Sequence, residues 1–150
     1  MENLQQERLV STMGAQAGAE WAIEHTIDYC KERRLFGKPL SNFQNTQFKL
    51  AEAATKVQIG RVFLDRLIEA HMAGDSIDME TSMGKWWITD MHFNVVHECF
   101  QFFGGYGYIT EYPICQAFTD SRVESIFAGS NEVMKTIIAG EVVWDREDNR

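Results

Sequence analysis

Apolar residues recur among polar ones at steps of three and four along most of this sequence, which is the spacing of amphipathic α-helices. No stretch keeps the strict alternation of a half-buried β-strand. The pattern predicts four helices with approximate ranges 3–33, 42–72, 79–103 and 131–144, and residues 106–127 are expected to form a loop with one helical turn. Four helices with short connections predict an all-α fold, an up-down four-helix bundle that forms a single domain over residues 1–150.

Each predicted helix carries an apolar stripe that would face the core. The stripe residues are Leu9, Met13, Ala17 and Ala22, then Leu50, Ala54, Val57, Leu64 and Ile68, then Trp87, Met91, Val95 and Phe102, and finally Val133, Ile137 and Ile138. The first helix also has small residues between Gly14 and Ala19, which would let either another helix or a flat ligand approach closely. We expect helix packing to be their role.

The composition of the chain argues against several classes of function. The chain has a formal net charge of -8 and no cluster of basic residues, which argues against a nucleic-acid-binding protein. No apolar run reaches the ~18 residues of a membrane span, and no signal peptide or other targeting segment is visible. The 3 cysteines show no CxxC pairing, so we expect reduced thiols that act as small core residues in a reducing compartment.

The sequence predicts no metal site, no serine-hydrolase site and no dinucleotide-binding fingerprint. The four histidines occur in no metal-binding motif, and His92 and His97 are spaced so that they lie on different faces of a helix. No serine occurs in the strand-to-helix turn of a hydrolase. The glycine-rich stretch that begins at Gly104 follows a helix and lacks the later glycine of a dinucleotide-binding fingerprint.

The stretch from Asp120 to Glu132 leads through a short apolar turn into the last helix. Gly129 can adopt backbone angles closed to other residues, and Ser130 is a good helix N-cap. A helix that begins there directs free N–H groups and a positive dipole end at the turn, which would suit an anionic group. By itself the stretch also fits an ordinary loop-to-helix junction.

Three stretches together resemble the C-terminal helical domain of the acyl-CoA dehydrogenase family. They are Arg33 to Leu40 leading to Gln44, Gln101 to Tyr108, and Asp120 to Glu132, and the likeness extends from about Glu7 to about Glu141. The resemblance implies an FAD-dependent enzyme that oxidises acyl-CoA thioesters to trans-2-enoyl products. In this family a carboxylate removes the α-proton while a hydride leaves the β-carbon for the flavin, and donors must stabilise the enolate-like oxygen.

The position of the catalytic base depends on the branch of the family. Many members carry it in the last loop as Tyr-Glu-Gly, but here that triplet is Phe127-Ala128-Gly129, and alanine cannot accept a proton. The site is therefore either inactive or of the isovaleryl- and long-chain-type branch, which places a glutamate before an arginine on the first helix. Glu7 and Arg8 match that pattern. We expect Glu7 to be the base, with Arg8, Ala128 and Gly129 at the substrate; alternatively, Glu7 is a first-turn glutamate favoured by the helix dipole and Arg8 is its charge partner.

The resemblance also implies two sets of FAD contacts. The first set, which would reach FAD bound mainly by a neighbouring subunit, comprises Arg33 at the pyrophosphate, Phe36 and Gln44 on the adenosine side, and Gln101, Gly104 and Gly105 close to the cofactor. The second set, Ser130 and Glu132, would touch FAD of its own subunit, although the family usually has Thr and Gln there. The alternatives are a helix C-terminal cation for Arg33 and simple helix termination for the glycines.

The family's enzymes also have an N-terminal helical domain and a middle β-domain, and neither has a counterpart in this sequence. We therefore expect a fragment or a stand-alone relative with half a site, which self-associates as a tetramer (a dimer of dimers). The implied partners are an acyl-CoA substrate and an electron-transfer flavoprotein as acceptor, in the bacterial cytoplasm or the mitochondrial matrix. The alternative is a non-catalytic helical module that assembles through the same faces; the presence of both Glu7 and Arg33 favours the enzyme.

Overall fold

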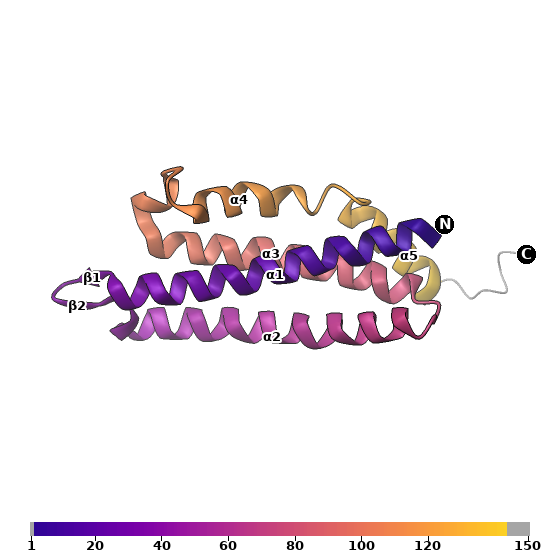
Figure 1. The fold of residues 1–150 in the computed structure, drawn as a ribbon, viewed down its shortest axis with the longest axis horizontal. Coiled ribbons are helices and arrows are strands. Elements are labelled where there is room, and N and C mark those ends of the chain that lie inside the picture. Colours follow the sequence, from indigo (N-terminus) through magenta and orange to yellow (C-terminus); the bar gives the residue numbers. More distant parts are fainter. Residues whose placement is uncertain (1, 144–150) are drawn as a thin grey trace, which may run out of the picture.

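The computed structural model describes residues 2–143, with side chains from residue 5 onward (Figure 1). Helices dominate the described residues, as the periodicity predicts. In chain order the elements are α1 (Glu2–Glu32), β1 (Arg34–Leu35), β2 (Lys38–Pro39), the 3-10 turn η1 (Leu40–Asn42), α2 (Gln44–Met72), α3 (Asp78–Phe103), the 3-10 turn η2 (Gly104–Tyr108), α4 (Pro113–Val123) and α5 (Asn131–Val142). The predicted end of the last helix at Trp144 lies outside the described residues.

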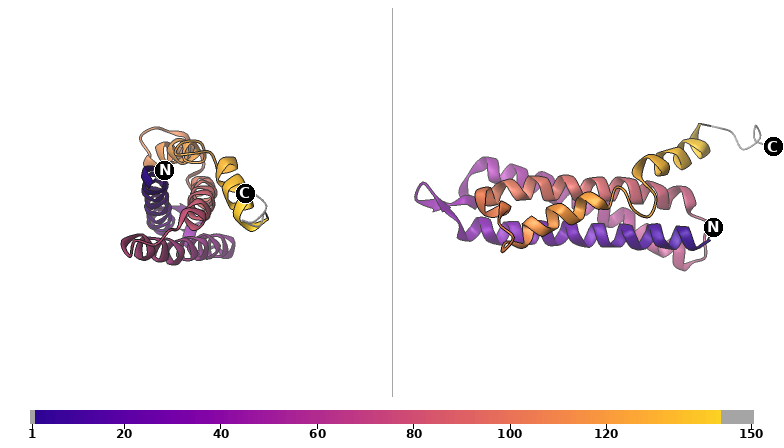
Figure 2. Two further views of the ribbon diagram at one scale, coloured as in Figure 1. Left: turned by 90° about the vertical axis from the view of Figure 1, so that its right-hand side faces the viewer. Right: turned by 90° about the horizontal axis from the view of Figure 1, so that it is seen from above.

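The first four helices form an up-down-up-down bundle (Figure 1). α1, α2 and α3 run side by side over their whole lengths, and α4 returns along α3 and α1. α5 packs on the outside of α3, at the end of the bundle where α1 begins (Figure 2). The predicted all-α bundle is confirmed, but its fourth member is α4, and the last helix of the sequence is an addition to it.

α4 occupies the stretch that was expected to be a loop with one helical turn. Pro113 stands in the first turn of the helix, where its missing N–H costs nothing. Ile114 and Ser121 are buried, and Ala117 and Phe118 pack against the core. These four residues repeat at steps of three and four, so a helical stripe is present, but it is short and contains a serine.

The buried stripes differ in register from the predicted ones. In α1, Met13 and Ala17 are exposed, whereas Thr12 and Gln16 are fully buried. Ala54 of α2 is also exposed, and its neighbour Ala53 is buried. Polar side chains can take core positions here because each finds a backbone acceptor: Thr12 Oγ1 donates to Arg8 O at 2.7 Å, and Gln16 Nε2 donates to Val57 O at 3.0 Å.

The small residues of α1 do serve helix packing. Ala15 and Ala19 are completely buried in the core that α1 shares with α3. At Gly18, a Cβ atom would lie 2.6 Å from the imidazole ring of His92. α1 can therefore approach α3 closely only because these positions carry little or no side chain.

Candidate functional site

Glu7 and Ala128 line the same surface hollow. The hollow has a volume of about 610 Å³, and its walls come from the first turns of α1 and from the loop before α5. The lining residues are Gln6, Glu7, Val10, Ser11, Phe127 and Ala128, and we call it the Glu7 hollow. The carboxylate predicted as a base and the alanine in place of the family's loop base thus face one space.

The loop wall of the Glu7 hollow has an unusual backbone. Ala128 has φ of 53°, a left-handed value that is uncommon for a residue with a Cβ, and Gly129 follows with φ of 90°. A Cβ on Gly129 would lie 2.8 Å from Met134 Cε. The positive φ favours glycine at position 129, and the two successive positive φ values turn the loop sharply just before Ser130.

The other two predicted substrate residues do not line the Glu7 hollow. Arg8 is half-buried on the adjacent face of α1, and its Nε has no hydrogen-bond partner among the described residues. Gln5 Nε2 and Ser11 Oγ are likewise buried without a partner within the described part of the chain. Three buried polar atoms of the first turns of α1, near Glu7, therefore have no partner among the described residues.

A second hollow of about 610 Å³ lies at the opposite end of the bundle, where α1 and α3 end. Four of the predicted cofactor residues, Arg33, Gln101, Gly104 and Gly105, line this Arg33 hollow. The Arg33 guanidinium lies 5.3 Å from the centre of the Tyr106 ring, and no carboxylate among the described residues pairs with it. A cation in this position is available to an anionic ligand.

The remaining members of that set, Phe36 and Gln44, lie outside the Arg33 hollow. Phe36 is 95% exposed at the tip of the β1–β2 hairpin, and its φ of 49° is followed by 84° at Gly37, a pair of positive values typical of a two-residue hairpin turn. Gln44 is exposed at the first position of α2. An aromatic ring with so little contact to its own chain is suited to contact another molecule.

Ser130 and Glu132 lie at the start of α5, beside the Glu7 hollow and far from Arg33. Ser130 Oγ accepts a hydrogen bond from Val133 N at 3.4 Å, which confirms the predicted N-cap. Hydrogen bonds from the backbone N–H of Glu132 and from the Ser130 hydroxyl lower the pKa of the Glu132 carboxyl. α1 has 31 residues, so about 45 Å of helix separates its two ends, and one chain cannot bring both predicted cofactor sets to one ligand atom.

The predicted buried face of α5 is only partly correct. Val133 is 49% exposed, and Ile137 and Ile138 are half-buried, whereas Asn131 and Met134 are buried. Asn131 takes this position because its side chain pairs with a buried lysine, which periodicity cannot reveal.

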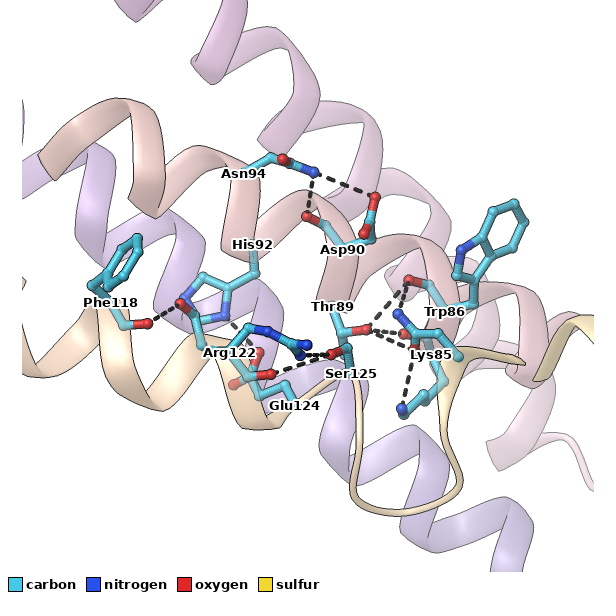
Figure 3. A network of polar contacts seen from close by, with 12 residues as sticks. Lys85, Trp86, Thr89, Asp90, His92, Asn94, Phe118, Arg122, Glu124 and Ser125 are labelled. Atoms are coloured by element: carbon cyan, nitrogen blue, oxygen red, sulfur yellow. Dashed lines mark hydrogen bonds and ion pairs between the residues drawn. The ribbon is translucent and has the colours of Figure 1, made fainter. Parts of the chain in front are cut away.

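Four residues that the sequence analysis assigned to no site form two buried polar contacts: α3 contacts the start of the loop before α5, and it contacts the first residue of α5 (Figure 3). Lys85 is completely buried, and its Nζ donates to Asn131 Oδ1 at 3.1 Å. Burial lowers the pKa of Lys85; Glu124 and Glu132 oppose this shift and Arg8 adds to it. No pattern in the sequence marks Lys85, because it lies two positions before Trp87 and therefore outside the predicted apolar stripe of the third helix.

His92 makes the second contact. Its Nδ1 donates to Glu124 Oε2 at 2.6 Å, and only 6% of the histidine side chain and 15% of the glutamate side chain are exposed. The other ring nitrogen, Nε2, is buried and has no partner among the described residues. His97, in contrast, is exposed, so the two histidines do lie on different faces of α3.

Within residues 2–143, no three His, Cys, Asp or Glu side chains gather in a way that could hold a metal ion. In the same part of the chain, no helix combines the length and apolar character needed to cross a membrane. Cys30 and Cys99 are buried free thiols, and burial raises the pKa of Cys30 to about 11, which makes it unreactive.

The chain matches known proteins over nearly its whole length. The profile of the family described as "Acyl-CoA dehydrogenase, C-terminal domain" matches residues 1–143. The long-chain specific acyl-CoA dehydrogenase of Sus scrofa mitochondria is 39% identical over 146 residues, which is 97% of this chain and 34% of that protein.

Solved structures of acyl-CoA dehydrogenases also resemble this chain. The acyl-CoA dehydrogenase of Geobacillus kaustophilus superposes with a TM-score of 0.91 at 54% identity, covering 93% of this chain and 37% of that one. The butyryl-CoA dehydrogenase of Megasphaera elsdenii gives a TM-score of 0.92 at 31% identity, over 95% of this chain and 37% of that one. This chain therefore spans little more than a third of the length of these relatives.

Proposed function

This chain belongs to the acyl-CoA dehydrogenase family, and on that premise we propose that it is the C-terminal domain of an FAD-dependent acyl-CoA dehydrogenase. The proposed reaction forms the α,β double bond of an acyl-CoA thioester. The observation that carries the proposal is the Glu7 hollow, in which a carboxylate from α1 faces Ala128 of the loop. The loop wall has lost its base at Ala128, but the opposite wall carries a carboxylate at Glu7. An active site requires such a carboxylate, whereas an inactive site does not.

Glu7 is the proposed acceptor of the α-proton. Because that proton is weakly acidic, the carboxylate must be shielded from water when it reacts. Glu7 is exposed within this chain, so the acyl group and the rest of the enzyme would have to exclude water around it. Ala128 leaves room for the acyl chain opposite the carboxylate, and Ser11 lines the same hollow. We propose that Arg8, the residue after Glu7 on α1, lies beside the substrate. Gly129 contributes by the turn that brings Ala128 to the hollow.

The residues of the Arg33 hollow fit the pyrophosphate part of FAD. Arg33 offers a forked cation that pairs with no carboxylate in residues 5–143, and added Cβ atoms on Gly104 and Gly105 would meet nothing within 4 Å, so a ligand can approach this backbone. We propose that Gln101 hydrogen-bonds at the same place, and that Phe36 and Gln44 reach the adenosine side. FAD, when bound, supplies the acceptor for the β-hydride.

We assign this first set to FAD held mainly by a neighbouring subunit and the second set to FAD of the same subunit. Their location at opposite ends of the bundle supports two different cofactor molecules. Ser130 would contact the nearer one. Glu132 is a carboxylate at neutral pH, as any glutamate without a raised pKa is, so we propose that it contacts a hydroxyl or N–H group of the cofactor.

The proposed partners follow from the same assignment. They are an acyl-CoA substrate, further copies of the chain in a tetramer, and an electron-transfer flavoprotein as acceptor. We place the enzyme in the bacterial cytoplasm or the mitochondrial matrix, because the relatives include bacterial enzymes and mitochondrial ones.

A chimera would test the proposal directly. Residues 1–143 of this chain would replace the matching segment of the Geobacillus kaustophilus dehydrogenase, with which they share 54% identity. Stopped-flow measurement under excess acyl-CoA of several chain lengths should show bleaching of the flavin. A chimera that is folded and binds FAD, yet bleaches with no acyl-CoA tested, would contradict the proposed function.

A non-catalytic assembly module is the second candidate, and it rests on an exposed apolar surface of α2. Phe48, Ile59 and Val62 are each more than half exposed along one side of α2, an apolar surface that suits association with another chain. Association would accompany either function, so the folded chimera decides between them.

A further inference from the structure

The loop between α4 and α5, residues 124–130, is attached to α3 at both of its ends (Figure 3). At its start, Glu124 Oε2 lies 2.6 Å from His92 Nδ1. Immediately after its end, Asn131 Oδ1 accepts from Lys85 Nζ at 3.1 Å. His92 and Lys85 are seven positions apart, which is about two helical turns, so both extend from one face of α3.

Both attachments are buried. Lys85 has no exposed surface, Asn131 is 5% exposed, and the hydroxyl of Thr89 also lies 3.3 Å from Asn131 Oδ1. A cation and a carboxylate removed from water are costly unless each keeps its partner. Moving the loop away from α3 would leave the lysine or the histidine buried without that partner, so these contacts oppose any displacement of the loop.

The His92 ring also fixes the distance between the loop and α1. A Cβ on Gly18 would lie 2.6 Å from both Cε1 and Nε2 of this ring, so the imidazole is in direct contact with the α1 backbone. Glu7 lies on the same helix, about three turns earlier. One side chain therefore touches the helix that carries Glu7 and holds the loop that carries Ala128.

We propose that Lys85 and His92 are positioning residues that fix the α4–α5 loop against α3 and thereby set the wall of the Glu7 hollow. The inference rests on the proposed function for its catalytic meaning. Ala128 has the left-handed φ of 53°, a conformation that persists only where the surroundings hold it. Within the loop, Asn131 N donates to Ser125 O at 3.0 Å and closes the turn, but the two contacts to α3 hold it in place.

Hydrogen exchange measured by mass spectrometry on the 150-residue chain tests the attachments without any ligand. The amides of Ile126, Phe127 and Asn131 donate within the loop region and should be protected. Glu124→Ala and Lys85→Met should each speed their exchange by about tenfold or more, because each removes a charge-assisted hydrogen bond. Glu124→Gln should retain most of the protection, since its amide oxygen can still accept from His92 Nδ1.

Two further variants keep the test decisive. If Lys85→Met does not fold, Asn131→Ala removes the same contact from the loop side. Val57→Ala on α2 is the control, because it weakens the core away from the loop and should leave the relative exchange of the loop unchanged. Exchange in Glu124→Ala and Lys85→Met equal to that of the parent chain would overturn the proposal, as would equal exchange in Glu124→Ala and Glu124→Gln.

The chimera described above provides the kinetic measurement. In the chimera, Glu124→Ala and Lys85→Met should each lower kcat for flavin reduction by about tenfold and change KM less. The reason is that a displaced loop alters the geometry of the reacting groups more than it weakens binding. Absence of reduction in the parent chimera would contradict the proposed function and leave the exchange result intact. Faster loop exchange with unchanged kcat would show that the attachments do not position the hollow, and would overturn this inference alone.

Discussion

Glu7 and Ala128 face one hollow although they lie near opposite ends of the sequence. α1 and the loop before α5 bring them together because both pack against α3 at the same end of the bundle. The family resemblance names both residues, one as a base and one as the place where a base is missing. Because Glu7 and Ala128 line the same hollow, both residues belong to one site.

Exchanging the base between the two walls tests this relationship in the FAD-loaded chimera. Glu7→Gln keeps the size of the side chain but removes the proton acceptor, so flavin reduction should fall by more than the ~10²–10⁴ of an ordinary acid–base contribution. Adding Ala128→Glu should restore part of the rate, because both positions face the same space. Alanine already bears the backbone strain of the left-handed φ of 53°, so a glutamate at position 128 should add little to it.

Stopped-flow flavin bleaching checks the pair, with FAD content measured for each variant. An unchanged rate in Glu7→Gln would show that Glu7 is merely a residue of the first helical turn.

A pair of glycine variants on α1 tests the contact with His92. Gly18→Ala should destabilise the chain by about 1–3 kcal/mol, because its Cβ would lie 2.6 Å from the ring and the ring is held by Glu124. Gly14→Ala is the matched control: nothing lies within 4 Å of its Cβ, so it should stabilise the helix by about 0.5–1 kcal/mol. Urea unfolding followed by circular dichroism measures both. Equal effects of the two changes would refute the contact.

The ion pair between α1 and α2 predicts a pH-dependent stability. Arg61 Nε and Nη2 donate to the two carboxylate oxygens of Glu20, each at 2.7 Å, and these hydrogen bonds lower the pKa of Glu20. A carboxyl with a lowered folded-state pKa contributes stability above its unfolded value, and loses it as the pH falls through the folded value. Glu20→Gln should therefore cost about 1 kcal/mol at pH 7, and the difference from the parent should vanish below the folded-state pKa.

Urea unfolding from pH 7 down to pH 3 gives this comparison. Asp65→Asn is the control, since Asp65 is more exposed and lies 3.5 Å from Arg61; it should change stability little. A constant difference between Glu20→Gln and the parent at all pH values would argue against the pair.

The exposed side of α2 predicts self-association. Phe48 and Val62 are 58% and 62% exposed, and we expect the chain to sediment as an oligomer at concentrations on the order of tens of micromolar. Phe48→Glu and Val62→Glu should shift it toward the monomer, because a charge in an apolar interface remains unpaired. Gln58→Glu, at an exposed polar position of α2, is the control. A parent chain that sediments as a monomer would contradict the expectation.

Arg33 and Arg34 follow α1 directly, and we expect Arg33 to bind FAD and Arg34 to stabilise the hairpin. Arg33 lines the hollow without a carboxylate partner among the described residues, whereas Arg34 Nη2 donates to Gly37 O at 2.8 Å in the hairpin. Arg33→Lys should weaken FAD binding to the chimera by about tenfold, because a lysine cannot form a two-pronged contact with phosphate. Arg34→Lys should leave FAD affinity nearly unchanged. Fluorescence titration of the apoprotein distinguishes these outcomes.

Local sequence determined the helices, the main breaks and the N-cap. Apolar periodicity located α1, α2, α3 and α5, and Gly104 and Ser130 end and begin helices as predicted. These features depend on contacts within a few residues, so they can be read from spacing alone. The motif resemblance likewise named Glu7 and Arg33, because it compares residue types in order and needs no coordinates.

Tertiary structure alone decided which side chains meet. The register of the buried stripe in α1 is seen only in its packing against α3, where Ala15 and Ala19 are buried. α4 is a bundle helix because its few apolar residues pack against α3 and α1. Lys85 and His92 resemble solvent-exposed residues in the sequence, yet they are buried against Asn131 and Glu124. A polar group is stable in a core only if its partner is present there, and that partner lies far away in the sequence, so no local pattern specifies it.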